Sequence, residues 1–357
     1  MSRIKHWAAF AALVLIAGCD RAPAPASESV PSPGSACDRG CLGSLLDRYL
    51  AAVVAHDAAK VPLVVGFRQT ENAINVVPGQ GGVWKSVTAL GNVQRKYFDP
   101  VTGQAGYYGT VKEGDETAIV TVRLRVENEQ LTEAEWYIAR ANDPGLNGPR
   151  QPGRPPANLH NPEYLEQHPP RQDAVPADQR VDRATLSRIV DSYFDAITSH
   201  DGSIALTHKG CGRAENGTPA PGGAFLPPAP PREGQPAAAS ASPSAGAQQP
   251  GAGSRDCVAG LENFNLSMVV ARRMPLIDEE AQIVMATGVF IRKPGSSTPR
   301  NVASWWFVID EAKIRTTYTA MFYPPATLAV PNWPPYEGHW PLPETTVPGA
   351  AASPASR

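Results

Sequence analysis

The sequence predicts an α+β protein made of two copies of one domain, and three observations carry this prediction. A segment with Tyr49, His56-Asp57 and Glu71-Asn72 occurs again at a constant offset of 144 residues. Each copy opens with a helical apolar pattern, and each then continues with alternating, strand-like runs. A gapless repeat of this kind is most economically explained by tandem duplication. The matched positions are Leu42/Leu186, Asp47/Asp191, Tyr49/Tyr193, Ala52/Ala196, His56/His200, Asp57/Asp201, Glu71/Glu215 and Asn72/Asn216.

The first helix of each copy is predicted from a single apolar stripe. In copy one the helix begins near Leu42 and ends at the turn His56-Asp57, and Asp57 can start a second short helix that reaches Lys60. In copy two the same stripe runs from Leu186 to Ile197. The stripe positions are Leu42, Leu45, Leu46, Tyr49, Leu50 and Val53, then Leu186, Ile189, Val190, Tyr193, Phe194 and Ile197.

Strands follow the helix in both copies. Residues 117–126 alternate apolar and polar side chains, which is typical of a strand with one buried face. Trp305-Trp306 places one indole on each face of its strand, so we expect one in the core and the other free to line a ligand surface. Helices followed by a meander of strands indicate the α+β class. The predicted strands are 106–111, 117–126, 131–139, 281–292, 301–309 and 313–322.

The amino terminus is predicted to be a lipoprotein signal. A basic start precedes the apolar run 7–17, which is too short to span a bilayer, and Ala17-Gly18 stands before Cys19. This pattern resembles a bacterial lipoprotein signal, which implies that Cys19 is lipidated and becomes the mature terminus. The alternative is an ordinary secretory signal with a stray cysteine. We therefore expect a cell-envelope protein anchored by lipid and facing the periplasm, and Asp20 suggests the inner membrane.

Segments rich in Pro, Ala, Gly and Ser separate the two copies and interrupt the second. They have little periodicity and cannot build a core. The predicted organisation is a signal peptide at 1–18, a disordered tether at 19–35, domain one at 36–141, a Pro-rich linker at 142–180, domain two at 181–342 with a disordered insertion at 218–255, and a disordered tail at 343–357.

Four cysteines remain once Cys19 is assigned to lipid. An even number in an oxidising compartment indicates two disulfides, and we pair the cysteines within copies, Cys37 with Cys41 and Cys211 with Cys257. Metal binding is the rival, but the spacing fits no zinc pattern, so we expect no metal.

Charge and motifs exclude several classes of function. The net charge is −2 and no long basic run is present, so we expect no nucleic-acid partner. The sequence contains no phosphate loop, GxSxG elbow or HExxH motif, and we expect no cofactor.

Several segments resemble a known superfamily. They are CDRGCLGSLLDRYLAAVVAHDAAKVPL and FRQTENA in copy one, with DSYFDAITSHDG, GRAENGT and PLIDEEAQIV in copy two. A helix ending in His-Asp, a strand carrying Glu-Asn and a curved meander resemble the NTF2-like superfamily, including its SnoaL-like members. More narrowly, the tandem resembles the uncharacterised DUF8021 family, over residues 37–140 and 183–325. The resemblance implies two cone-shaped domains, each with N-terminal helices packed on a curved antiparallel sheet around a pocket.

Members of this superfamily include dehydratases, isomerases, cyclases and binding or assembly modules, so the fold leaves the function open. His56 and His200, with Glu71 and Glu215, are the candidate acid–base residues. Each also has a structural reading, since a histidine at a helix C-terminus and a carboxylate that caps a backbone amide both stabilise a fold. The candidate binding residues are Tyr49, Asn72, Tyr193 and Asn216.

Three functions follow from these residues. The first is a binding module for a small apolar ligand or an envelope protein. The second is a cofactor-independent lyase or isomerase of the SnoaL-like kind, which uses the histidines and glutamates. The third is a scaffold whose domains pair through their sheets. The oligomeric state and the ligand are not fixed by the sequence.

Overall fold

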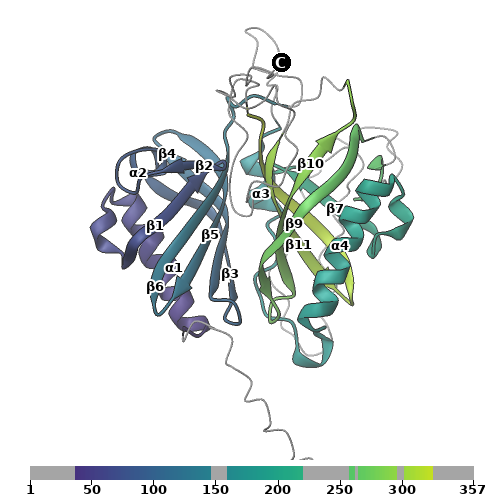
Figure 1. The fold of residues 1–357 in the computed structure, drawn as a ribbon, viewed down its shortest axis with the longest axis horizontal. Helices are drawn as coiled ribbons and strands as arrows, with labels where there is room; N and C mark the ends of the chain where they lie inside the picture. Colours follow the sequence, from purple (N-terminus) through teal and green to yellow (C-terminus); the bar gives the residue numbers. More distant parts are fainter. Residues whose placement is uncertain (1–36, 146–158, 220–256, 262–263, 296–300, 325–357) are drawn as a thin grey trace, which may run out of the picture. The chain divides into compact units, whose positions relative to one another are not determined.

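A computed structural model of the chain contains two six-stranded sheets, each with one long helix beside it (Figure 1). It describes residues 37–145, 159–219, 257–261, 264–295 and 301–324. The α+β prediction is confirmed. The predicted signal peptide, the lipidation site Cys19, the tether, nearly all of the insertion and the tail lie outside the described residues.

The first repeat has its strands in the order β2-β1-β6-β5-β4-β3. β1 and β6 are parallel, and the other neighbours are antiparallel. Its elements are α1 (Arg39–Val54), η1 (Ala58–Lys60), β1 (Leu63–Glu71), β2 (Ile74–Val76), α2 (Val83–Ser86), β3 (Ala89–Asp99), β4 (Gln104–Glu113), β5 (Glu116–Glu127) and β6 (Gln130–Ala139).

The second repeat has the matching order β8-β7-β12-β11-β10-β9, again with one parallel pair, β7 and β12. Its elements are α4 (Arg183–Ser199), η3 (Gly202–Ile204), β7 (Thr207–Glu215), β8 (Thr218–Pro219), β9 (Leu266–Asp278), β10 (Ile283–Arg292), β11 (Val302–Asp310) and β12 (Lys313–Phe322). Between the repeats, α3 (Pro162–Gln167) and η2 (Ala177–Gln179) lie in the segment predicted as a linker.

Both long helices begin at an aspartate cap. The Asp38 side chain accepts a hydrogen bond from the Cys41 amide at 2.8 Å, and Asp182 accepts one from the Thr185 amide at 2.7 Å. Such caps satisfy backbone N–H groups that have no partner within the helix. The caps stand at the repeat offset, and α1 and α4 bury the predicted stripes in separate cores, one for each repeat.

The outer strands β3 and β9 were not predicted, because neither has a simple alternating pattern. β3 carries polar side chains along much of its length and has a register irregularity between Leu90 and Gln94. β9 contains Arg272, Arg273 and Pro275 and several register shifts against β10. Proline and bulges are tolerated at a sheet edge, where a strand pairs on one side.

A third core joins the two sheets. It contains Tyr97, Tyr108 and Ile119 of the first repeat with Met285 and Trp306 of the second. The Trp306 indole donates to the Thr121 hydroxyl at 2.8 Å, and the Ser304 hydroxyl donates to the same oxygen at 2.7 Å. Trp305 lies in the core of the second repeat, which confirms that the two indoles occupy opposite faces. Trp306 is buried between the sheets and lines no ligand surface.

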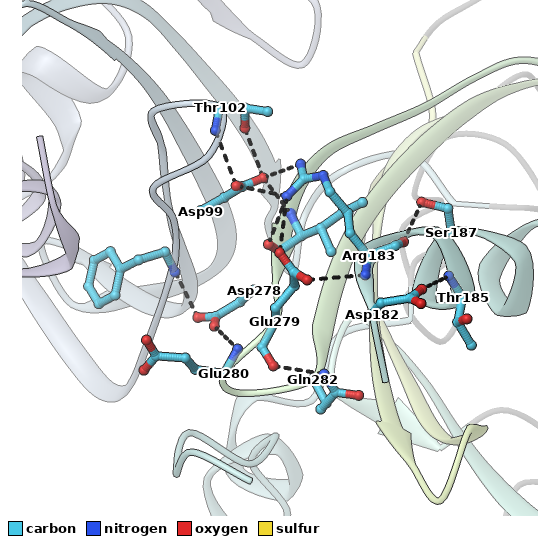
Figure 2. A network of polar contacts seen from close by, with 12 residues as sticks. Asp99, Thr102, Asp182, Arg183, Thr185, Ser187, Asp278, Glu279, Glu280 and Gln282 are labelled. Carbon is cyan, nitrogen blue, oxygen red and sulfur yellow. Dashed lines mark hydrogen bonds and ion pairs between the residues drawn. The ribbon is translucent and has the colours of Figure 1, made fainter. Parts of the chain in front are cut away.

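The contact between the repeats contains two reciprocal ion pairs. Arg39 binds both oxygens of Asp278, at 2.8 and 2.7 Å. Arg183 binds both oxygens of Asp99, at 2.9 and 2.6 Å (Figure 2). The arginines stand at the repeat offset, and each aspartate ends an outer strand and is fully buried. Backbone amides complete the exchange: that of Phe98 donates to Asp278 and that of Ile277 to Asp99. Each repeat thus contributes one arginine, one aspartate and one backbone amide to the contact, as the two subunits of a two-fold dimer would.

Candidate functional site

The repeated histidines end the long helices and hold a neighbouring segment. The backbone of His56 and His200 adopts the left-handed conformation, with φ of 56° and 57°. The Nδ1 atom of His56 lies 2.8 Å from the carbonyl oxygen of Trp84, and that of His200 lies 3.3 Å from the carbonyl oxygen of Leu261. Each ring therefore fastens its helix end to the segment that follows β2 or β8.

The aspartates and asparagines of the repeat also have structural partners. Asp57 and Asp201 cap the short helices η1 and η3. The Asn72 amide pairs with both backbone groups of Ile138, at 3.0 and 2.7 Å, and the Asn216 amide does the same with Met321, at 2.9 and 2.7 Å. These bonds tie the turn after β1 or β7 to the last strand of its sheet.

A chain of hydrogen bonds fills the interior of the first repeat. The Trp136 indole donates to the Tyr49 hydroxyl at 2.9 Å, and that hydroxyl donates to the Gln69 side-chain oxygen at 2.8 Å. The Trp84 indole donates to the same Gln69 oxygen at 2.9 Å. All four side chains are buried, and burial raises the pKa of Tyr49. Tyr49 is therefore a satisfied core residue with a closed polar network around it.

Glu71 lies at the end of this chain and caps α2. One of its oxygens accepts from the Val83 amide at 3.0 Å and from the Gln69 side chain at 3.1 Å. Burial raises the pKa of Glu71, although these hydrogen bonds act in the opposite direction. Gly82 lies so close that a Cβ there would meet the carboxylate at 2.0 Å. In the described structure no hydrogen bond joins His56 to Glu71 or His200 to Glu215.

In the second repeat, Tyr193 and Arg213 converge on one backbone carbonyl. The Tyr193 hydroxyl and the Arg213 Nη1 each lie 3.2 Å from the oxygen of Cys257. Cys257 is bonded to Cys211 of β7, and Cys37 to Cys41, so both predicted disulfides are confirmed. The Arg213 guanidinium also lies over the Phe264 ring and 3.5 Å from Glu215.

Comparison with known proteins gives a family match in the second half of the chain and a distant structural similarity. Residues 179–321 match the family model of a domain of unknown function, DUF8021. The second repeat matches DUF8021. A crystal structure of an NTF2-like protein of unknown function from Cytophaga hutchinsonii ATCC 33406 is similar at 12% identity, over 28% of this chain and 89% of that one, with a TM-score of 0.24. No curated protein matches the chain.

The second repeat differs from the first at the positions that fill the interior. Gln69 of the first repeat is matched by Arg213, at the same offset of 144 residues. Trp136, which stands opposite Glu71, is matched by Thr319, which stands opposite Glu215. The residue whose backbone carbonyl contacts the repeated histidine is Trp84 in the first repeat and Leu261 in the second. A neutral amide and two indoles are thus replaced by a cation and two smaller side chains.

In the second repeat, two buried polar atoms on the face toward α4 lack hydrogen-bond partners. The Nε atom of Arg213 and the hydroxyl of Thr317 are buried and make no hydrogen bond. These residues are directly opposite each other on β7 and β12, so both side chains point to the face that α4 covers. Gln69, the counterpart of Arg213, makes all its bonds within the first repeat. An unmade bond at a buried group costs about 1–3 kcal/mol, so leaving these two atoms unpaired is unfavourable.

Aromatic side chains pack around Tyr193 in the core of the second repeat. Tyr193 meets the Phe307 ring edge-on at 5.5 Å, and Phe194 meets Trp305 edge-on at 5.9 Å. Phe290 stacks on Trp305 at 4.8 Å. Apolar surface next to a few convergent polar groups is the usual composition of a small-molecule site.

Arg213 was missed by the sequence reasoning, which followed what the copies share. The signal was present: residues 213 and 215 share one face of a strand, and 213 is where FRQTEN becomes GRAEN. No helix of the described residues is both long and apolar enough to cross a membrane. The same residues hold no cluster of three or more His, Cys, Asp or Glu side chains suited to a metal ion.

Proposed function

We propose that this protein is a lipid-anchored ligand-binding protein of the cell envelope, in which the second repeat takes up a small molecule. The observation that supports this most strongly is the difference between the interiors. The first repeat closes its interior with Trp84, Trp136 and a complete hydrogen-bond chain. In the second repeat the two indoles are replaced by the smaller side chains of Leu261 and Thr319, and Gln69 is replaced by the buried Arg213. The membrane anchor is proposed from the lipoprotein-like sequence around Cys19.

The first repeat has a different role in this proposal. Its filled interior leaves it as a rigid partner that supports the second sheet through the shared core and the two ion pairs. The lyase or isomerase alternative receives no support from the repeated residues, because His56 and His200 contact backbone carbonyl groups and make no pair with Glu71 or Glu215.

A library of small apolar and acidic compounds, screened by thermal unfolding of the full chain, tests this function. A ligand present at about 100 times its Kd adds about 2.7 kcal/mol to the free energy of unfolding, which is a readily measured rise in Tm. We expect hits on the wild-type protein that are lost in Thr319→Trp, which places in the second repeat the residue that fills the first.

Thr319→Val is the matched control, because it keeps the volume of the side chain and should keep the hits. Hits that survive unchanged in a folded Thr319→Trp protein would place the ligand elsewhere. A screen without hits on the wild-type protein would favour the other proposed occupant, an envelope protein.

A further inference from the structure

We infer that the ligand of the second repeat carries a carboxylate group, which pairs with Arg213, on an otherwise apolar body. This inference rests on the proposed function and names the class of molecule that the site selects. It follows from the partners of Arg213, from the comparison with Gln69 and from the surrounding aromatic residues.

The Arg213 charge is buried but only partly compensated. The residue is 7% exposed, and its guanidinium has five N–H donors to satisfy. Its described partners are the Cys257 carbonyl, the Tyr193 hydroxyl and Glu215, whose oxygen is 3.5 Å from Nε without forming a hydrogen bond. Burying a charge without full pairing is costly, so a buried arginine in this state favours an added anion.

The fold itself does not need this charge. At the matched position the first repeat has Gln69, with the same strand order and the same tyrosine from the long helix. The arginine is therefore a specific property of the second repeat. A carboxylate matches the planar guanidinium with two parallel, charge-assisted hydrogen bonds.

The rest of the site favours an apolar body on the ligand. Phe194, Phe290 and Trp305 supply aromatic surface on α4, β10 and β11, beside the corner formed by Tyr193 and Arg213. Thr317, directly opposite Arg213, has a buried hydroxyl with no partner and can serve as a second polar contact for the carboxylate.

The test compares acids with their neutral amides on the full chain by titration calorimetry. Phenylacetate and hexanoate are the probes, and phenylacetamide and hexanamide are the matched neutral compounds. We expect at least one acid to bind at least about 10-fold more tightly than its amide. Arg213→Gln should remove this preference and leave the fold intact, because the first repeat has glutamine at the matched position. Arg213→Lys, which keeps the charge and loses the fork, should retain part of it.

Arg188→Gln is the control, because it removes an exposed arginine of the same repeat, on α4, away from the proposed site. Equal binding of acid and amide, or an Arg213→Gln protein with an unchanged preference, would overturn the carboxylate assignment. If acid and amide bind equally and both are lost in Thr319→Trp, the proposed binding function stands without the carboxylate assignment. No binding by any of the four probes also overturns this assignment, and the library screen then decides the proposed function separately.

Discussion

At the scale of single residues, the positions that the repeats share stabilise the fold, and a position where they differ suggests the function. His56 and His200, which have positive φ after the long helices, contact backbone carbonyl groups. Asn72 and Asn216 bind the backbone of strands β6 and β12. A residue that serves the backbone in this way is retained after duplication whatever the domain binds. Arg213, in contrast, stands where the first repeat has Gln69.

Asn216→Ala tests the structural role of the asparagines. The change removes both bonds to the Met321 backbone and leaves a buried N–H and C=O unpaired, at about 1–3 kcal/mol each. Its φ of 47° adds strain for alanine. We expect urea unfolding to show a loss of about 2–4 kcal/mol. Asn75→Ala, at an exposed position of β2, should cost little, and equal losses would contradict this reading.

Glu71→Gln tests the buried carboxylate of the first repeat. Its folded pKa is raised by burial, so the stability that the neutral acid provides is present below the unfolded pKa and is lost as the pH rises through the folded pKa. Glutamine keeps the oxygen that binds Val83 and Gln69. The variant should therefore be more stable than wild type near neutral pH, and the difference should disappear in acid.

Glu113→Gln provides the opposite sign for comparison. Burial acts to raise the pKa of Glu113, but its bonds with Arg140 and Ser86 lower it overall. Its contribution to stability is present above the unfolded pKa and is lost as the pH falls through the folded pKa. Denaturant unfolding across this range should show Glu113→Gln less stable than wild type near neutral pH. The same sign for both variants would refute the assignment of these two environments.

At the scale of elements, a short segment in each repeat is held at the end of the long helix by the repeated histidine. In the first repeat α2 carries Trp84 and is held by His56 and Glu71. In the second, residues 257–261 take this place, held by His200 and by the disulfide to β7. The Cys257 carbonyl is the group that Tyr193 and Arg213 share, so this disulfide also positions the proposed site.

The two disulfides should contribute unequally. Cys211 and Cys257 are separated by 46 residues, and Cys37 and Cys41 by 4. Loop-closure entropy gives about 4 kcal/mol for the longer loop and about 2 kcal/mol for the shorter one. Cys211→Ser with Cys257→Ser should lower the unfolding midpoint more than the other double variant, and it alone should weaken ligand binding. Unfolding curves that rank them in reverse would contradict this.

At the scale of the whole molecule, the repeats behave as the two halves of an internal dimer. Their sheets share a core, and the charges at its margin are exchanged between equivalent positions, Arg39 to Asp278 and Arg183 to Asp99. Each buried aspartate has its arginine partner in the other repeat, so neither half alone pairs these charges. This agrees with the scaffold hypothesis as a statement about architecture, and it leaves the ligand site to the second repeat.

Asp99→Asn and Asp278→Asn should therefore be similarly costly. Removing one partner of a buried pair typically costs about 3–5 kcal/mol, and each change also weakens bonds to backbone amides. Adding Arg183→Met to Asp99→Asn should cost less than the sum of the single changes, as thermal unfolding would show. Asp47→Asn, which affects an exposed pair with Lys96, is the control. Costs that differ widely between the two aspartates would argue against a symmetric interface.

Prediction from the sequence succeeded where local pattern is sufficient. The stripes of α1 and α4, the alternation of residues 117–126 and the cysteine pairing each depend on neighbours along the chain or on a simple count. It failed at β3 and β9, whose irregular patterns reflect bulges at a sheet edge and burial against the other repeat. The candidate site residues were chosen from the shared motif, and a motif shared by two copies reflects what both folds require.

The sequence by itself determined the duplication, the α+β class and the two disulfides, because periodicity, a constant offset and cysteine number are properties of the chain alone. Only the tertiary structure decided what the motif residues do and where the repeats diverge. A hydrogen-bond partner such as Met321 for Asn216, or Asp278 for Arg39, lies more than 100 residues away and is set by sheet pairing and packing. For the same reason the surroundings of Arg213 cannot be predicted from a local pattern. Its neighbours Cys257 and Thr317 are distant in the sequence, and so are the residues that stand in place of the two indoles of the first repeat.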